Sequence, residues 1–153
     1  MNKSFLRCLP AFVLVVLSFT SGAFSAESDP ASIARSKGHG TISFEGSGTL
    51  IISGDGVLIV NDNATVTLED PQDNDKSPGC FVTSSSSCIY IALKGNAWVA
   101  GENLTVSFTG ANIGLTASGN AKLTLKGYGI YIYDKSVGRW STDEKGAIIN
   151  LTN

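Results

Sequence analysis

The chain has 153 residues, a net charge of −2 at pH 7 and a low charged fraction of 16%. Its basic side chains are scattered along the sequence, and no basic stripe points to nucleic acid as a partner. The length suits a single domain with a substantial apolar core.

Residues 1–26 are predicted to be a signal peptide. Lys3 and Arg7 precede an apolar stretch over residues 11–19, and small residues follow where a signal peptidase would cut. The apolar stretch is short for a bilayer span, and the later sequence has no second stretch of that kind. We therefore expect a periplasmic or secreted protein with no membrane span in its mature form.

Residues 27–37 are predicted to form a short N-terminal cap helix. Asp29 can cap it, Pro30 suits its first turn, and Ile33 and Ala34 give it a small apolar side. Such a helix is too short to be stable alone, so we expect it to cover the open end of the first strands.

The remainder, residues 38–153, is predicted to be one β-repeat domain with a beat of eight residues. Turn-forming glycines recur eight apart, at Gly38/Gly40, Gly46/Gly48 and Gly54/Gly56. Apolar residues follow at two fixed offsets, as in Ile42 and Phe44, which is the alternation of a strand with one buried face. The beat slips by a residue or two near Gly101 and Gly110, which predicts bulges or altered corners there.

Two all-β folds satisfy this beat. We favour a small parallel β-helix, a solenoid with sides of about eight residues, in which Ile42 stacks under Val66 and Tyr90. The alternative is an antiparallel meander or sandwich, in which Phe44 faces Leu50 across a glycine turn. The alternation of inward and outward side chains does not distinguish the two folds, because repeats of eight and of twenty-four residues are both even. The solenoid is preferred because Tyr90 returns in phase after an interruption.

That interruption, within residues 70–88, is predicted to be a loop that carries a disulfide. Its prolines and aspartates exclude a central strand. Cys80 and Cys88 are spaced to pair in an oxidising compartment. With His39 as the only histidine in the sequence, we expect no metal site and no cofactor.

The sequence offers little for catalysis, and we predict no catalytic residues. His39 sits in a Gly-x-Gly turn, and no Gly-x-Ser-x-Gly nucleophile elbow occurs. Glu45 and Glu69 are 24 residues apart and would stack in a solenoid, at a spacing that suits a polysaccharide-active enzyme. The plainer interpretation is two solvated surface acids, and we expect a protein that is not an enzyme.

Aromatic residues in the second half are the better binding candidates. The predicted binding residues are Trp98, Tyr131, Tyr133 and Trp140. Their rings could stack on sugars or anchor a protein partner, although the closing tail could instead cover them. The main hypothesis is a structural or interaction module whose partner is a glycan or a surface protein. The alternative is a carbohydrate-binding module.

Two strings, GSGTLIISGDG at 46–56 and GANIGLTASGNAKLTLKGYG at 110–129, carry a resemblance to known proteins. They resemble the Gly-x-Gly repeats of uncharacterised secreted bacterial β-helical proteins, including adhesin-head-like domains of the GIN type. The resemblance covers roughly residues 38–133 and implies an extracytoplasmic scaffold. Those families share no catalytic motif that maps onto positions of this chain.

Overall fold

The computed structural model describes residues 32–69, 81–82 and 87–153. The strands are β1 (Ala34–Asn61), β2 (Thr65–Glu69), β3 (Phe81–Val82), β4 (Ser87–Tyr133), β5 (Ser136–Arg139) and β6 (Ala147–Leu151). No helix long and apolar enough to cross a membrane occurs in these residues. The all-β prediction is therefore confirmed. The predicted signal peptide lies outside the described residues.

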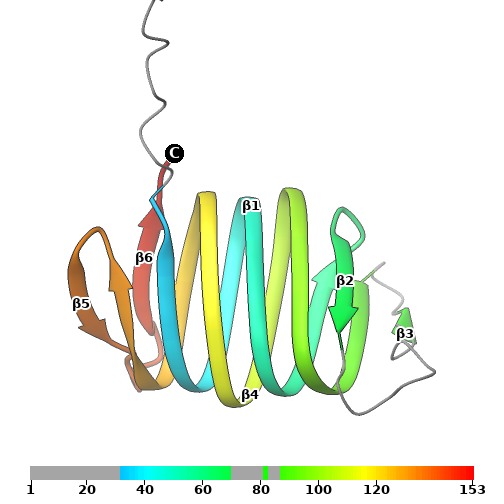
Figure 1. Ribbon diagram of the computed structural model, residues 1–153, viewed down its shortest axis with the longest axis horizontal. Helices are drawn as coiled ribbons and strands as arrows, with labels where there is room; N and C mark the ends of the chain where they lie inside the picture. The colour runs from blue at the N-terminus through cyan, green and yellow to red at the C-terminus, as the bar shows by residue number, and fades with distance from the viewer. Residues whose placement is uncertain (1–31, 70–80, 83–86) are drawn as a thin grey trace, which may run out of the picture.

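β1 and β4 are long strands that coil side by side around a common axis (Figure 1). Each pass of β1 lies between two passes of β4. Arg35, for example, pairs with both Thr116 and Ile132, and Thr116 in turn pairs with both Arg35 and Ile51. Both intervals are sixteen residues, so one full turn of the coil takes two beats of eight.

The predicted parallel β-helix is wrong, because all pairings between these strands are antiparallel. Ile42 lies between Phe108 and Leu125 rather than beside Val66. Both arrangements bury the same side chains, and this is why parity could not separate them. The antiparallel alternative has the right strand direction but the wrong partners, since Phe44 pairs with Val106 and Leu123, not with Leu50.

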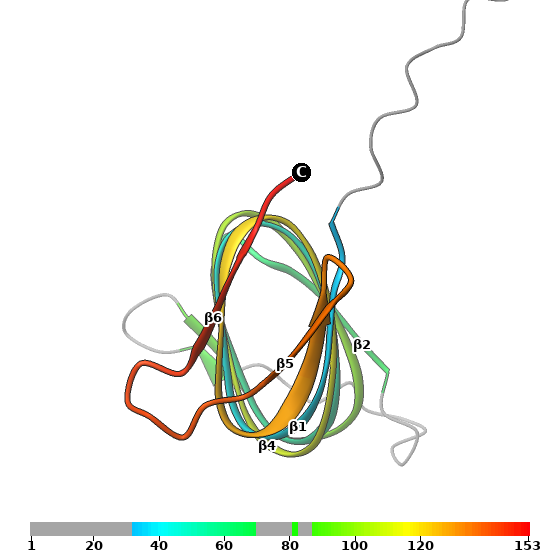
Figure 2. The ribbon, with the colours of Figure 1, turned by 90° about the vertical axis from the view of Figure 1, so that its left-hand side faces the viewer.

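The coil is flattened, with two broad faces joined by tight corners (Figure 2). We name each face after the strand at its edge. The β5 face contains, in order, β5 and residues 130–133, 34–37, 113–118, 49–53, 96–100 and 65–69. The β6 face contains β6 and residues 121–125, 41–46, 104–109, 57–61, 87–90 and 81–82.

The core fills the space between the two faces. Alternate side chains of β1 and β4 point inward, and the residues of β1 that were predicted to face the interior are buried, whereas Val66 and Tyr90 are partly buried against them. The buried residues of β1 include Ile42, Phe44, Leu50, Ile52, Leu58 and Val60. β4 supplies the opposing layer, with large side chains such as Phe108, Leu123 and Leu125. Alternate burial along each strand therefore holds the coil together through the hydrophobic effect.

Glycines stack in columns at the corners. One column contains Gly127, Gly40, Gly110 and Gly56, which are successive partners across the coil. The opposite corner holds Gly119, Gly48 and Gly101. The predicted slips near Gly101 and Gly110 are confirmed as irregularities, because Asn103 and Asn112 adopt positive φ angles of 52° and 53°.

The predicted cap helix at 27–37 is wrong where the structure describes it. Residues 34–37 belong to β1, and Arg35 and Lys37 pair with both neighbouring passes of β4. The short segment is strand because a place between two passes of β4 satisfies its backbone on both sides, which local helix propensity cannot match. Residues 27–31 lie outside the described residues.

Candidate binding site at the capped end of the coil

The end of the coil that holds β5 and β6 is closed by a hairpin and the tail that follows it. β4 turns into β5 through Asp134 and Lys135, whose φ angles of 46° and 62° are those of a tight two-residue hairpin turn. After β5, Ser141 forms backbone hydrogen bonds with Gly127 and Leu125 of β4. This tail brings Trp140 to the mouth of the core.

Trp140 covers the end of the hydrophobic core at this end of the coil. Its side chain is 6% exposed, and its indole N–H donates to the hydroxyl oxygen of Ser36. The Ser36 hydroxyl donates onward to the carbonyl oxygen of Ile130 at 2.9 Å. Gly38 and Gly129 leave room for the ring, because a Cβ at either position would come within about 3.0 Å of it. The indole N–H is thus engaged by the fold itself.

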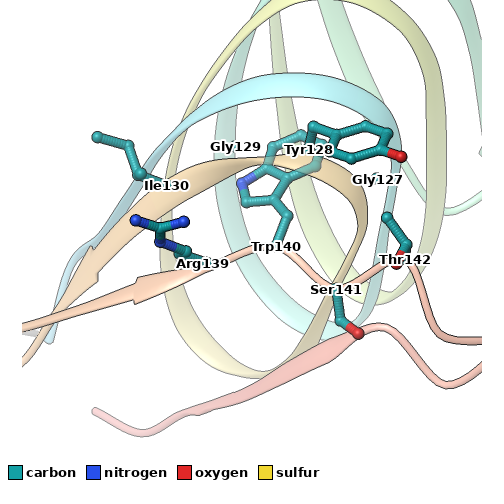
Figure 3. A pocket seen from close by; sticks show the side chains of 8 residues that line it. All are labelled: Gly127, Tyr128, Gly129, Ile130, Arg139, Trp140, Ser141 and Thr142. Carbon is teal, nitrogen blue, oxygen red and sulfur yellow. The ribbon is translucent and has the colours of Figure 1, made fainter.

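A groove lies on the outer side of Trp140, and we call it the end groove (Figure 3). Its volume is about 540 Å³, and it is lined by Gly127, Tyr128, Gly129, Ile130, Arg139, Trp140, Ser141 and Thr142. Apolar ring and aliphatic surface, a guanidinium and two hydroxyls therefore meet in one concavity. That mixture suits a ligand with both apolar and hydrogen-bonding surfaces.

Tyr128 dominates the rim of the end groove. Its side chain is 66% exposed, and its ring centroid lies 5.4 Å from that of His39 at an angle of 32°. Tyr128 and His39 are direct partners at a corner of the coil. Tyr128 stands in β4 between Gly127 and Gly129, and His39 stands in the neighbouring pass of β1. Apart from its contact with the His39 ring, the Tyr128 ring is largely exposed to solvent.

The predicted binding residues fall into three places. Trp140 lines the end groove. Tyr131 and Tyr133 line a second hollow of about 370 Å³, between the hairpin and β6. Trp98 lies half-buried on the β5 face, between Ile51 and Thr67. The structure therefore does not bring the four together, and their role in binding stays a prediction.

Tyr131 and Tyr133 also stabilise the β4–β5 hairpin. Both pack against the core, as the interpretation of a covering tail supposed. Tyr131 lies opposite Gly138, where its ring occupies the space that a side chain would need. The hydroxyl of Tyr133 donates to the carbonyl oxygen of Asn150 at 3.0 Å, which ties the hairpin to β6.

Tyr128 is the more exposed of the two aromatic residues that line the end groove, and the predicted binding set does not include it. Tyr128 is one of the aromatic residues concentrated in the second half of the sequence, but it was left out of that set. The available signal was its position between Gly127 and Gly129, at a beat where the chain turns a corner. An aromatic residue at such a position has no neighbour to bury it.

The acidic pair considered for catalysis is separated by the antiparallel winding. Glu45 pairs with Thr105 and Lys122 on the β6 face, whereas Glu69 pairs with Asn96 on the β5 face. The stacking of Glu45 on Glu69, which the parallel solenoid required, is therefore wrong. Within residues 32–69, 81–82 and 87–153, no group of three or more His, Cys, Asp or Glu side chains is placed to hold a metal ion.

Comparison with known proteins adds no relative to this picture: no protein family, curated protein or solved structure matches the chain. The resemblance to GIN-type repeats and the predicted export therefore stay predictions. So does the disulfide between Cys80 and Cys88, because Cys80 lies outside the described residues. Cys88 is in β4, where it pairs with Val60 and Val82.

Proposed function

We propose that the protein is a non-enzymatic interaction module of the periplasm or cell exterior, which binds its partner through the end groove. The observation that carries this proposal is the largely exposed aromatic ring of Tyr128, which lines a groove of about 540 Å³. Tyrosine and arginine are among the residue types that most often anchor a protein partner. Tyr128 and Arg139 both line the end groove.

The rigidity of the frame also supports a binding role. The end groove is bounded by the pass of β4 that holds Tyr128 and by the segment that holds Trp140 and Ser141. These segments are joined by backbone hydrogen bonds, Trp140 N–H to Gly129 at 3.0 Å and Gly127 N–H to Ser141 at 2.9 Å. A preformed site loses little conformational entropy on binding, which favours affinity.

Site-specific photocrosslinking tests this proposal in the cells that produce the protein. A photoreactive phenylalanine analogue would replace Tyr128, and a matched control would carry the same group at Glu102, an exposed residue near the opposite corner. We expect a discrete adduct from position 128 and none of the same mass from position 102. An identical pattern at both positions, or no adduct at 128, would contradict the proposal.

Carbohydrate is the second candidate ligand class, and one observation favours it. The exposed ring of Tyr128 stands in the same groove as the hydroxyls of Ser141 and Thr142 and the guanidinium of Arg139. A ring that can stack on a sugar, with hydrogen-bonding groups beside it, supplies both interactions that a sugar needs.

A glycan array separates this candidate from a protein partner. Binding to an array member that is lost in Tyr128→Ala and kept in Trp98→Ala would support a sugar site at the end groove. Trp98 is the matched control because its ring is half-buried on the β5 face, away from the groove. A lack of binding to every member of a broad array would contradict the carbohydrate candidate. The photocrosslinked adduct would then identify a protein partner.

A further inference from the structure

A second surface lies next to the end groove, on the outer side of the hairpin. The start of β1, the end of β4 and β5 are neighbours there, and their outward side chains align in rows of direct partners. We call this surface the hairpin patch. It contains, in one row, Arg35, Ile132 and Val137 and, in the next, Lys37, Ile130 and Arg139.

The apolar half of the hairpin patch is unusually open to solvent. Ile130, Ile132 and Val137 are 53%, 48% and 72% exposed. They adjoin one another across the β4–β5 hairpin, so they form one apolar strip rather than scattered residues. A depression of about 160 Å³ opens beside them, toward Arg35 and Lys37. A contiguous apolar strip on an outer face indicates a contact surface.

The charged half of the patch is entirely basic. Arg35, Lys37 and Arg139 are all exposed, and none of the six side chains of the patch is acidic. The next strand inward, toward the centre of the β5 face, extends the two rows with Thr116 and Gly114, which carry no charge. The chain as a whole is acidic, with 13 acidic against 11 basic residues. The positive charge at this end is therefore a local concentration against the overall balance.

We propose that the hairpin patch docks the protein on a membrane surface rich in anionic phospholipids. Basic side chains would pair with lipid phosphates, and the aliphatic strip would enter the boundary between headgroups and acyl chains. Lys37 and Arg139 are separated by one strand, about 10 Å, so they can contact separate headgroups.

The aliphatic strip favours lipid over an acidic polymer. Binding to a nucleic acid or an acidic glycan depends on cations with hydrogen-bonding or stacking groups, and exposed isoleucine and valine add little to either. In a membrane interface the same side chains gain by leaving water. Ile130 and Arg139 belong to both the end groove and the hairpin patch, whereas Arg35, Lys37, Ile132 and Val137 do not line the groove. Variants at these four residues therefore test the patch separately from the groove.

Vesicle co-sedimentation tests the proposal with protein recovered after export. We expect binding to vesicles of equal parts phosphatidylglycerol and phosphatidylcholine, and none to phosphatidylcholine alone. Arg35→Glu with Lys37→Glu should weaken binding by about tenfold or more. Ile132→Asp with Val137→Asp should do the same, because it removes two of the three aliphatic side chains of the strip and keeps all three cations.

Matched controls lie on the opposite face. Lys122→Glu with Lys126→Glu makes the same change of net charge at two exposed residues of the β6 face. Ile148→Asp places a charge at a residue that is 48% exposed, as Ile132 is. Both controls should bind like the unaltered protein. If a patch variant fails to fold, Arg35→Gln with Lys37→Gln and Ile132→Thr with Val137→Thr take its place.

Three results would overturn the proposal. The first is a lack of binding to anionic vesicles by the unaltered protein. The second is an equal loss in the patch and control variants, which would reflect net charge alone. The third is loss on charge reversal with full binding in the aliphatic variants, which would indicate a general polyanion site. Tyr128→Ala should leave vesicle binding unchanged, so failure here and failure at the end groove are distinguishable.

Discussion

Gly40 and Gly127 are direct partners at a corner of the coil, and each leaves the space that the other's backbone occupies. A Cβ at Gly40 would collide with the carbonyl oxygen of Lys126, and one at Gly127 with that of His39. Their φ angles of +137° and +129° are also strained for any other residue. The corner columns thus set how closely successive passes of β1 and β4 can approach.

Alanine at Gly40 or Gly127 should therefore destabilise the fold strongly. We expect a loss of about 3 kcal/mol in the free energy of unfolding, from backbone strain together with overpacking. Urea denaturation followed by circular dichroism would measure it. Gly114→Ala is the control, because the closest atom that a Cβ would meet there is the hydroxyl of Ser53, which can rotate away. An equal loss at Gly114 would contradict the importance of the corners.

Trp140 and Ser36 should be energetically coupled. Ser36→Ala leaves the buried indole N–H without its acceptor, at a cost of about 1–3 kcal/mol. Trp140→Phe removes the donor and part of the packing that closes the end of the coil. In the double variant the N–H penalty of Ser36→Ala is absent, so the combined loss should be smaller than the sum of the two single losses. Strictly additive losses would contradict the coupling.

Alanine substitution of Tyr131 should destabilise the fold much more than alanine substitution of Tyr128, because Tyr131 is the more buried of the two. Tyr131→Ala should cost about 2–3 kcal/mol, because the ring packs on the core and covers Gly138. Tyr128→Ala should change stability by less than about 0.5 kcal/mol, because the ring is largely exposed. Thermal denaturation of the two variants side by side checks the contrast. A loss in Tyr128→Ala as large as in Tyr131→Ala would show that the Tyr128 ring supports the fold.

If the protein is exported without residues 1–26, which contain Cys8, and Cys80 pairs with Cys88 as the sequence predicts, it should contain no free thiol. Alkylation without reductant should then leave both cysteines unmodified, and reduction should lower stability by about 2–3 kcal/mol, since the bridge closes a short loop. Mass spectrometry of the alkylated protein measures this. Two alkylated cysteines in the unreduced protein would contradict the disulfide.

The inward-facing residues were predictable from the sequence, but the direction of the strands was not. Period-two alternation within each beat identifies Ile42 and Phe44 as core residues whatever their partners are. Their actual partners, such as Phe108 and Leu125, lie more than sixty residues away along the chain. Only the winding of β1 between two passes of β4 brings them together, and no local pattern encodes that.

The two surfaces at the capped end were hidden for the same reason. Arg35 and Lys37 are about a hundred residues from Arg139, and their charges look scattered in the sequence. The register of β1 with β4, and of β4 with β5, gathers them on one patch. The aromatic residues of the second half were a useful indication of this end, although Trp98 belongs to another part of the β5 face.

The antiparallel winding of β1 with β4 is tested most directly by crosslinking paired cysteines. Thr41 and Thr109 are direct partners on the β6 face, and their hydroxyl oxygens lie 3.1 Å apart. Thr41→Cys with Thr109→Cys should therefore form a disulfide on mild oxidation, located by peptide mapping. Thr41→Cys with Thr65→Cys should not, because residue 65 lies on the β5 face. A bond between positions 41 and 65, with none between 41 and 109, would contradict the fold.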